Sequence, residues 1–225
     1  MINVRYADGT TLTIDRAGDA DAAAIARLYK HAHINERTYK ERIDPNSPRN
    51  FFHIGGIFCA YDEASLIKEI HTSRSVFLSV KKENDMAAFL WVSAQDPSFG
   101  DIADGKTIYL RDIVVLDSAR HMSIPHILSY VVFTAASRKG YTRSMLEIYE
   151  IAEPVRLLNS ESAKSVLSSG GTEAGRLPQK LIRISGTDVD VRIDPLAFSF
   201  EYTSAIPLLT EKLTGKGVTI SENAH

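Results

Sequence analysis

The sequence has 225 residues, of which 44% are hydrophobic and 24% are charged, as in an ordinary globular protein. Its 26 basic and 28 acidic side chains leave a formal net charge of -2, which gives no electrostatic signal for nucleic acid or a membrane surface. No apolar run reaches the ~18 residues that span a bilayer, and the N-terminus lacks a signal-peptide core. The single cysteine, Cys59, fits a reducing compartment, so we expect a cytoplasmic protein.

The N-terminal part of the chain predicts a hairpin, a helix and an irregular segment. Two alternating runs, Ile2 to Tyr6 and Thr11 to Asp15, are joined through Asp-Gly, which is a good hairpin signal. A helix then starts at Asp19 or Asp21. Residues 35–60 are less regular, and their aromatic side chains either shape a pocket or hold an irregular surface loop in place.

The following segment predicts a second helix and a second hairpin. Asp62 can cap a helix that runs over residues 63–71. Two runs with strand character, at 74–81 and 86–94, are joined by the polar tetrapeptide 82–85. These two strands are therefore expected to pair with each other in an antiparallel arrangement.

A strand, a polar loop and a helix follow between Thr107 and Lys139. The strand, Ile108 to Leu116, is rich in β-branched and large apolar residues, which predicts that it is covered on both faces. Ser123 can cap the helix through its hydroxyl, and Pro125 fits the first turn. Such a unit presents free N–H groups and the positive end of a helix dipole at a sheet edge, where anions are favoured.

The last third of the chain predicts further strands around one helix. A strand over 143–151 precedes a helix that Pro154 opens and Gly170-Gly171 stops. A hairpin (180–185 and 188–193) and a short strand (197–202) follow, and the tail from Thr214 looks frayed. The element order predicts an α/β protein with a mixed, largely antiparallel sheet and helices on both faces.

The stretch TIDRAGDADAAAIARLY and the central strand–loop–helix resemble the GNAT superfamily of acyl-CoA N-acyltransferases, over roughly residues 13–171. In that family the loop reads Gln/Arg-x-x-Gly-x-Gly/Ala; Arg120 to Pro125 stand at these positions and only Arg120 agrees outright. The resemblance implies acetyl-CoA or another acyl-CoA as co-substrate. It implies donor-binding residues Val114, Val115 and Leu116 for pantetheine, Arg120, His121, Met122, Ser123 and Ile124 for the pyrophosphate, and Asn159.

Two departures from the loop pattern have physical consequences. Glycines let the backbone approach phosphates closely, whereas Ser123 adds a Cβ and a hydroxyl. Pro125 removes one N–H group from the loop. Three alternatives follow: acyl-CoA binds in a shifted position, it binds weakly, or it binds elsewhere.

The resemblance also implies catalytic residues. Family members often carry a glutamate base on the strand after the central helix, and Glu147 stands there; alternatively, Glu147 is a solvated or salt-bridged strand carboxylate. The stretch NSESAKSVLSSGG puts Val166 where the family often has a tyrosine that protonates the leaving thiolate. Valine cannot donate a proton, so Tyr149, Ser165 or water would serve, or the thiolate leaves unprotonated.

Other candidate sites are weaker. The histidines lack metal-ligand spacing and no Cys-x-x-Cys occurs, so we predict no metal site. Arg111 and Asp112 lie inside the apolar strand, and a buried charge is costly unless it is paired. Asp112 is therefore either a second acid/base candidate or a member of a structural ion pair.

We predict a GNAT-like domain over 1–175 and a C-terminal β extension over 176–225 packed on it. The expected function is acyl transfer from CoA to the primary amine of a small molecule or peptide. One alternative is a catalytically degenerate GNAT-fold binding module. Another is an acyltransferase that uses a carrier-protein or tRNA-linked donor. The extension could complete the sheet, cover the acceptor site or pair across a homodimer edge.

Overall fold

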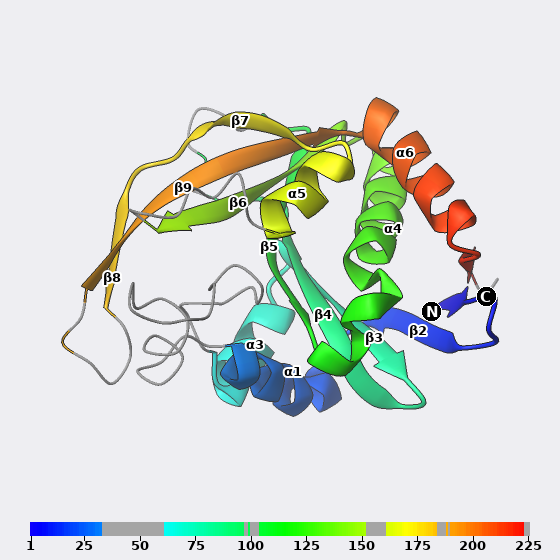
Figure 1. Ribbon diagram of the computed structural model, residues 1–225. Helices are drawn as coiled ribbons and strands as arrows, with labels where there is room; N and C mark the ends of the chain where they lie inside the picture. The colour runs from blue at the N-terminus through cyan, green and yellow to red at the C-terminus, as the bar shows by residue number, and fades with distance from the viewer. Residues whose placement is uncertain are drawn as a thin grey trace, which may run out of the picture.

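The computed structural model describes residues 1–32, 61–96, 99, 104–151, 161–183, 188 and 190–222. They form one open sheet with helices against it (Figure 1). The strands are β1 (Ile2–Arg5), β2 (Thr11–Arg16), β3 (Ser75–Lys82), β4 (Asp85–Ser93), β5 (Thr107–Val115), β6 (Arg143–Ile151), β7 (Thr172–Arg176), β8 (Lys180–Arg183), β9 (Asp190–Glu201) and β10 (Thr219–Glu222). The helices are α1 (Asp19–Ala32), α3 (Glu63–Ile70), the 3-10 helix η3 (Asp117–Met122), α4 (Ile124–Arg138), α5 (Glu161–Ser168) and α6 (Tyr202–Gly215).

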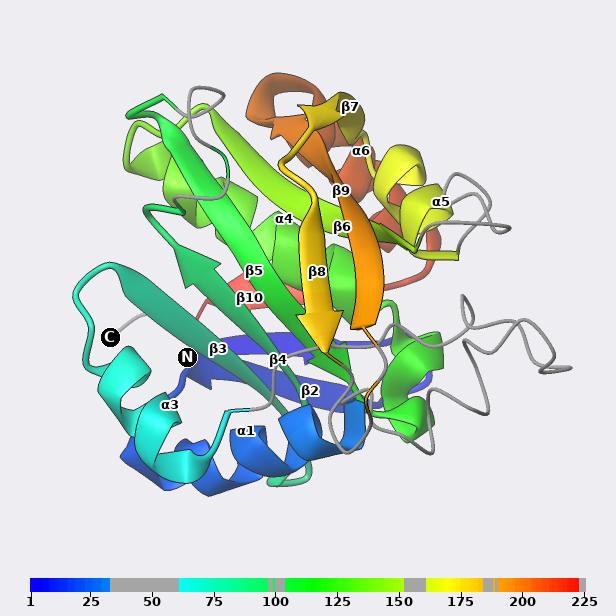
Figure 2. The same cartoon turned by 90° about the vertical axis from the view of Figure 1, so that its left-hand side faces the viewer.

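The sheet is mixed and largely antiparallel, as the sequence predicts. Its order is β10-β1-β2-β3-β4-β5-β6-β9-β7, with β8 paired to β9 (Figure 2). Among the strand pairs formed by the described residues, only β5 and β6 run parallel, and α4 connects them. A parallel pair needs such a crossover, since a tight turn can join only antiparallel strands.

Helices cover both faces of the sheet, and this prediction is confirmed. On one face, α1 and α3 pack against Phe77, Phe89 and Trp91, all of which are fully buried. On the other face, α4 and α6 enclose a larger apolar core with alternate residues of β3 and β4, among them Val80 and Leu90. The two-residue period of a strand sends neighbouring side chains to opposite cores.

Several local predictions hold at the level of single residues. The β1–β2 and β3–β4 hairpins form, and the second turns through Glu83 and Asn84, both with positive φ. This is the backbone of the tight turns that suit a twisted hairpin. Asp62 caps α3, because its carboxylate accepts a hydrogen bond of 2.7 Å from the N–H of Ser65. The expectations for 35–60, and for a helix opening at Pro154, lie outside the described residues.

The parallel pairing of β5 and β6 ends early. Each strand has nine residues, yet only Thr107–Tyr109 pair with Arg143–Met145. β6 instead pairs along its whole length with β9, and both strands turn away from β5 beyond this point (Figure 1). The distal half of β5 consequently has a strand on only one of its edges, in the part of the chain that the structure describes.

The expectation of a frayed C-terminal tail is wrong. Helix α6 packs lengthwise on α4 through Tyr202, Ala205, Leu209 and Leu213, and β10 then adds to the sheet beside β1. The short strand expected over 197–202 is the end of β9, whose two edges pair with β6 and β7. The division into two domains stays a prediction. None of the described helices is long and apolar enough to cross a membrane.

The α6–α4 interface predicts a large stability effect at Leu209, which is fully buried. Leu209→Ala should lower the free energy of unfolding by about 2–5 kcal/mol, because it leaves a cavity between two helices. Leu181→Ala is the matched control, since that leucine is 70% exposed. Chemical denaturation measures both variants, and equal small effects would contradict a packed C-terminal helix.

Candidate functional site

A β-bulge in β5 shapes the region where β5 and β6 part. Trp91 of β4 pairs with Asp112, but the next residue, Val92, pairs with Leu110, so Arg111 is the extra residue. Before the bulge, Leu110 faces the core under α4; after it, Val114 faces the core under α1. A bulge turns a strand in this way and often lies beside an active site.

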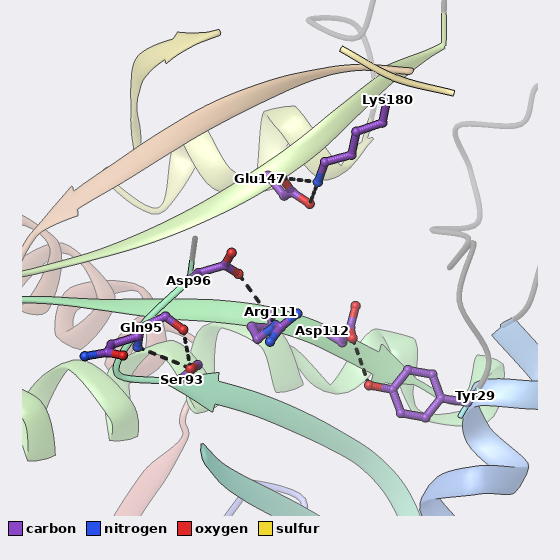
Figure 3. A network of polar contacts seen from close by, with 8 residues as sticks. All are labelled: Tyr29, Ser93, Gln95, Asp96, Arg111, Asp112, Glu147 and Lys180. Atoms are coloured by element: carbon purple, nitrogen blue, oxygen red, sulfur yellow. Dashed lines mark hydrogen bonds and ion pairs between the residues drawn. The ribbon is translucent and has the colours of Figure 1, made fainter. Parts of the chain in front are cut away.

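Asp112 is held by Tyr29 of α1. The Tyr29 hydroxyl donates a hydrogen bond of 2.8 Å to Oδ2 of Asp112 (Figure 3). Part of Asp112 remains accessible, yet protein surrounds the carboxyl closely, and this burial raises its pKa. The Tyr29 hydrogen bond and the charge of Arg111 lower the pKa against this effect, and the negative charge of Glu147 raises it again.

Arg111 has partners of its own. Its guanidinium lies 4.3 Å from the centre of the Trp91 ring, which is a cation–π geometry. Its Nε lies 3.6 Å from Oδ2 of Asp96. Both charged residues of β5 are therefore paired, but with side chains of other elements rather than as one isolated ion pair. A role for Asp112 in acid/base chemistry stays a prediction.

Glu147 lies on β6, beyond its last pair with β5. Both of its carboxylate oxygens accept hydrogen bonds from Nζ of Lys180 on β8, at 2.9 and 3.0 Å. Figure 3 shows the Glu147 side chain pointing from β6 toward β5, where Arg111 and Asp112 lie. The salt-bridged alternative for Glu147 is thus realised, and its role as a base is untested. A carboxylate that holds one ammonium group can hold another in its place.

The segment proposed for pantetheine lies at the end of β5. Val114 and Val115 pair with Phe89 and Ala88 of β4, and the N–H of Leu116 bonds the carbonyl of Ala87 at 2.9 Å. Because β6 has already turned away, the other edge of these residues faces no described strand. Their role in binding pantetheine stays a prediction.

The expected loop is instead η3 followed by one left-handed residue. Ser123 has φ 56° and ψ 24°, the conformation that glycine adopts most easily, at the position where the family pattern has glycine. The prediction that its hydroxyl caps α4 is wrong. The left-handed backbone turns the side chain away, and Oγ accepts a hydrogen bond of 2.7 Å from Nζ of Lys216.

The structure limits the supply of N–H groups at this turn. The N–H groups of His126 and Ile127 bond the carbonyl of Ser123, and Pro125 has none. Within η3 the helical bonding uses further N–H groups. Arg120 lies 2.8 Å from Asp117 in an ion pair, and the Tyr6 hydroxyl donates to the carbonyl of Met122 at 2.6 Å. The pyrophosphate role of residues 120–124 stays a prediction.

The structure describes only some of the remaining residues that the sequence predicts for the site. Tyr149 lies on β6 opposite Pro195, but its side chain is not described, and Asn159 lies outside the described residues. Val166, at the family's tyrosine position, packs in the core. A Cβ on Gly171 would come within 2.6 Å of the Val166 side chain and 3.0 Å of Phe200, so glycine is required there.

Three residues of this region, Tyr29, Lys180 and Lys216, carry no signal of their role in the sequence. Tyr29 is 83 residues from its partner Asp112, Lys180 is 33 residues from Glu147, and Lys216 is 93 residues from Ser123. Such pairings leave no local pattern. The one available signal was Asp112 itself, because an acid inside an apolar strand requires a buried partner.

Because Ser123 has a left-handed backbone, we predict that glycine is more stable than alanine at position 123, which is the reverse of the order inside a helix. Ser123→Gly should be more stable than Ser123→Ala by about 1 kcal/mol, because both lose the hydroxyl and only alanine keeps the strained conformation. In the exposed helical position 135 of α4, Ala135→Gly should cost about 1 kcal/mol. Denaturant titration of these variants would contradict the assignment if alanine were preferred at both positions.

Burial of Asp112 predicts a pH dependence of stability. Since its pKa is raised in the folded protein, wild-type stability falls as pH rises from about 3.9 through the raised pKa. Asp112→Asn removes this loss, so its stability relative to wild type should increase between pH 4 and pH 7, as measured by urea titration.

Asp104→Asn provides the opposite control for this measurement. A hydrogen bond from the Thr107 hydroxyl holds the pKa of Asp104 below its usual value. Its contribution to stability is present at neutral pH and is lost as pH falls through the lowered pKa. The relative stability of Asp104→Asn should therefore decrease as the pH rises from about 2 to about 5. Slopes of the same sign for both variants would contradict the account.

No protein-family model matches the sequence, and no curated protein sequence matches it significantly. Among solved structures the chain is similar to ribosomal-protein-S18-alanine N-acetyltransferase from Escherichia coli (16% identity, 85% of this chain and 94% of that chain covered, TM-score 0.54). It is also similar to a putative acetyltransferase of the GNAT family from Desulfovibrio desulfuricans (14% identity, 85% of this chain and 99% of that chain covered, TM-score 0.56). A third similar structure is yncA from Salmonella typhimurium, a putative acetyltransferase solved with its cofactor acetyl-CoA (16% identity, 83% of this chain and 92% of that chain covered, TM-score 0.53). Together with the split parallel pair and the bulged β5, these similarities show that the chain has the GNAT fold.

Proposed function

We propose that this protein is an acyl-CoA-dependent N-acyltransferase, in the first instance an acetyltransferase, that acts on a primary amine. The observation that carries the proposal is the pairing of Glu147 with an ammonium group beyond the point where β5 and β6 part. The fold shared with acetyltransferases, one of them solved with acetyl-CoA, supports the choice of donor.

The donor would lie along the edge of β5 that no described strand pairs with. The backbone of Val114 and Val115 offers the extended pairing that a pantetheine arm needs, and the thioester would then reach the region of Asp112 and Glu147. The start of α4 lies at the other end of this path, where the helix dipole favours the phosphates. CoA when bound would supply the activated acyl group as a thioester.

Glu147 would act as the general base. An amine arrives protonated, and a carboxylate that takes one proton frees the nitrogen lone pair. The nitrogen then attacks the thioester carbonyl, a C–N bond forms, the C–S bond breaks, and the thiolate leaves. The thiolate takes its proton from water or from a hydroxyl, for which Tyr149 remains a candidate. The acceptor ammonium must displace Lys180 from Glu147, which makes Lys180 a competitor in the acceptor position.

Aromatic side chains lie beneath the region beside Asp112. Tyr61, at the end of the aromatic segment of the sequence, lies 5.1 Å from the Tyr29 ring and 5.4 Å from the Trp91 ring. Tyr29 and Trp91 are fully buried, so of these three rings only the partly exposed Tyr61 can contact an acceptor. We expect the acceptor amine to belong to a small molecule or a peptide.

Replacement of Glu147 tests the proposal. Glu147→Gln keeps the shape but cannot take a proton, so turnover should fall at least about 100-fold. The assay measures release of free thiol from acetyl-CoA with a panel of primary amines. Glu173→Gln, at an exposed carboxylate of β7, is the matched control and should leave turnover unchanged. Undiminished turnover in Glu147→Gln would remove Glu147 from the mechanism, and absence of thiol release in wild type with every amine would contradict the proposal.

A further inference from the structure

Two lysines at the C-terminal end of α6 lie near the beginning of α4. Lys212 is in the last turn of α6 and Lys216 is its C-cap residue. Nζ of Lys216 donates a hydrogen bond of 2.7 Å to Oγ of Ser123, the residue directly before α4. Helix α6 is fixed in this place by its packing on α4 and by β10, which pairs with β1. The backbone that carries the two lysines is therefore held beside the turn.

His126, in the first turn of α4, lies within electrostatic reach of both lysines. Its Nδ1 is inaccessible to solvent and has no hydrogen-bond partner among the described residues. Burial lowers the pKa of His126, and the charges of Lys212 and Lys216 lower it further. Burial, followed by the charge of Lys216, also lowers the pKa of Lys212. Lys212, Lys216 and His126 are therefore close enough to interact electrostatically.

No acidic side chain compensates these charges in the part of the chain that the structure describes. Neither lysine takes part in an ion pair there, and the hydroxyl of Ser123 is the only hydrogen-bond partner of either Nζ. Every acidic side chain with an ion pair near η3 or α4, such as Asp117 or Glu222, is paired with another cation, Arg120 or Arg138.

The charges at this place have opposing effects. Like charges four residues apart at a helix end repel. The N-terminus of α4 disfavours a nearby cation, whereas the C-terminus of α6, where both lysines lie, favours it. Ser123 adds the cost of a left-handed backbone in a residue other than glycine. Bound negative charge would reverse the first two effects, because the lysines and the helix terminus would then all attract the same group.

We propose that Lys212 and Lys216 form a phosphate-binding site at the start of α4 and, resting on the proposed function, that they hold the phosphates of the acyl donor. Lysine suits this role as a mobile point charge. The side chains of α6 would replace N–H groups that Pro125 and the 3-10 bonding of η3 remove from the turn. The C-terminal helix would then be part of the donor site rather than a cover over the core.

The experiment compares wild type with Lys212→Gln/Lys216→Gln by calorimetric titration. Glutamine keeps the length of the side chain without the charge. The ligands are CoA, dephospho-CoA, pantetheine and inorganic pyrophosphate. We expect the double variant to bind CoA at least 10-fold more weakly, with a smaller salt dependence, and to bind pantetheine as wild type does. Lys68→Gln/Lys106→Gln removes the same charge at exposed positions away from the turn and should bind CoA like wild type.

The arms of this experiment separate the possible results. If the double variant loses affinity for dephospho-CoA as well, the lysines hold the diphosphate; if only CoA is affected, they hold the 3′-phosphate, and both results support the site. Lysine-dependent binding of pyrophosphate without binding of CoA would support the phosphate site and contradict the proposed donor. CoA binding that is equal in both proteins would overturn this inference and leave the proposed function standing. Failure of wild type to bind either CoA or pyrophosphate would overturn both.

Discussion

β5 and β6 pair over only three residues, and the rest of the candidate site depends on this short register. Because the strands part after Tyr109 and Met145, no described strand pairs with the outer edge of the distal half of β5, and Glu147 of β6 faces across the opening. The bulge at Arg111 lies just past the parting and turns Asp112 toward Tyr29. A continuous parallel ladder would have occupied this edge, and the proposed donor could then not lie between β5 and the carboxylate of β6.

The C-terminal helix adds a second constraint, this time electrostatic. By packing on α4, α6 buries Leu209 and its neighbours and at the same time carries Lys216 to Ser123. Burial of these side chains stabilises the fold. The N-terminus of α4 disfavours the nearby lysine charge and the C-terminus of α6 favours it, so the lysines lie between two opposing dipole effects.

Local patterns predicted much of the fold, and contacts distant in sequence account for what was missed. The hairpins, the cap at Asp62 and the strand–helix–strand unit follow from alternation, turn residues and helical spacing, all of which act within a few residues. Helix α6 escaped because Pro207 lies inside it and β9 continues into it without a break. Two contacts depend on how the fold brings distant strands and helices together. They are the ion pair of Glu147 with Lys180 and the hydrogen bond from Lys216 to Ser123. The cap assigned to Ser123 failed because the spacing of residues does not reveal a left-handed backbone.

The most direct test of the account is a crystal structure of the protein with acetyl-CoA. The account predicts the pantetheine arm against the edge of β5 at Val114 and Val115, the thioester near Glu147, and the phosphates beside Ser123, Lys212 and Lys216. A donor bound with its phosphates away from the start of α4, or with its thioester far from β6, would contradict the account.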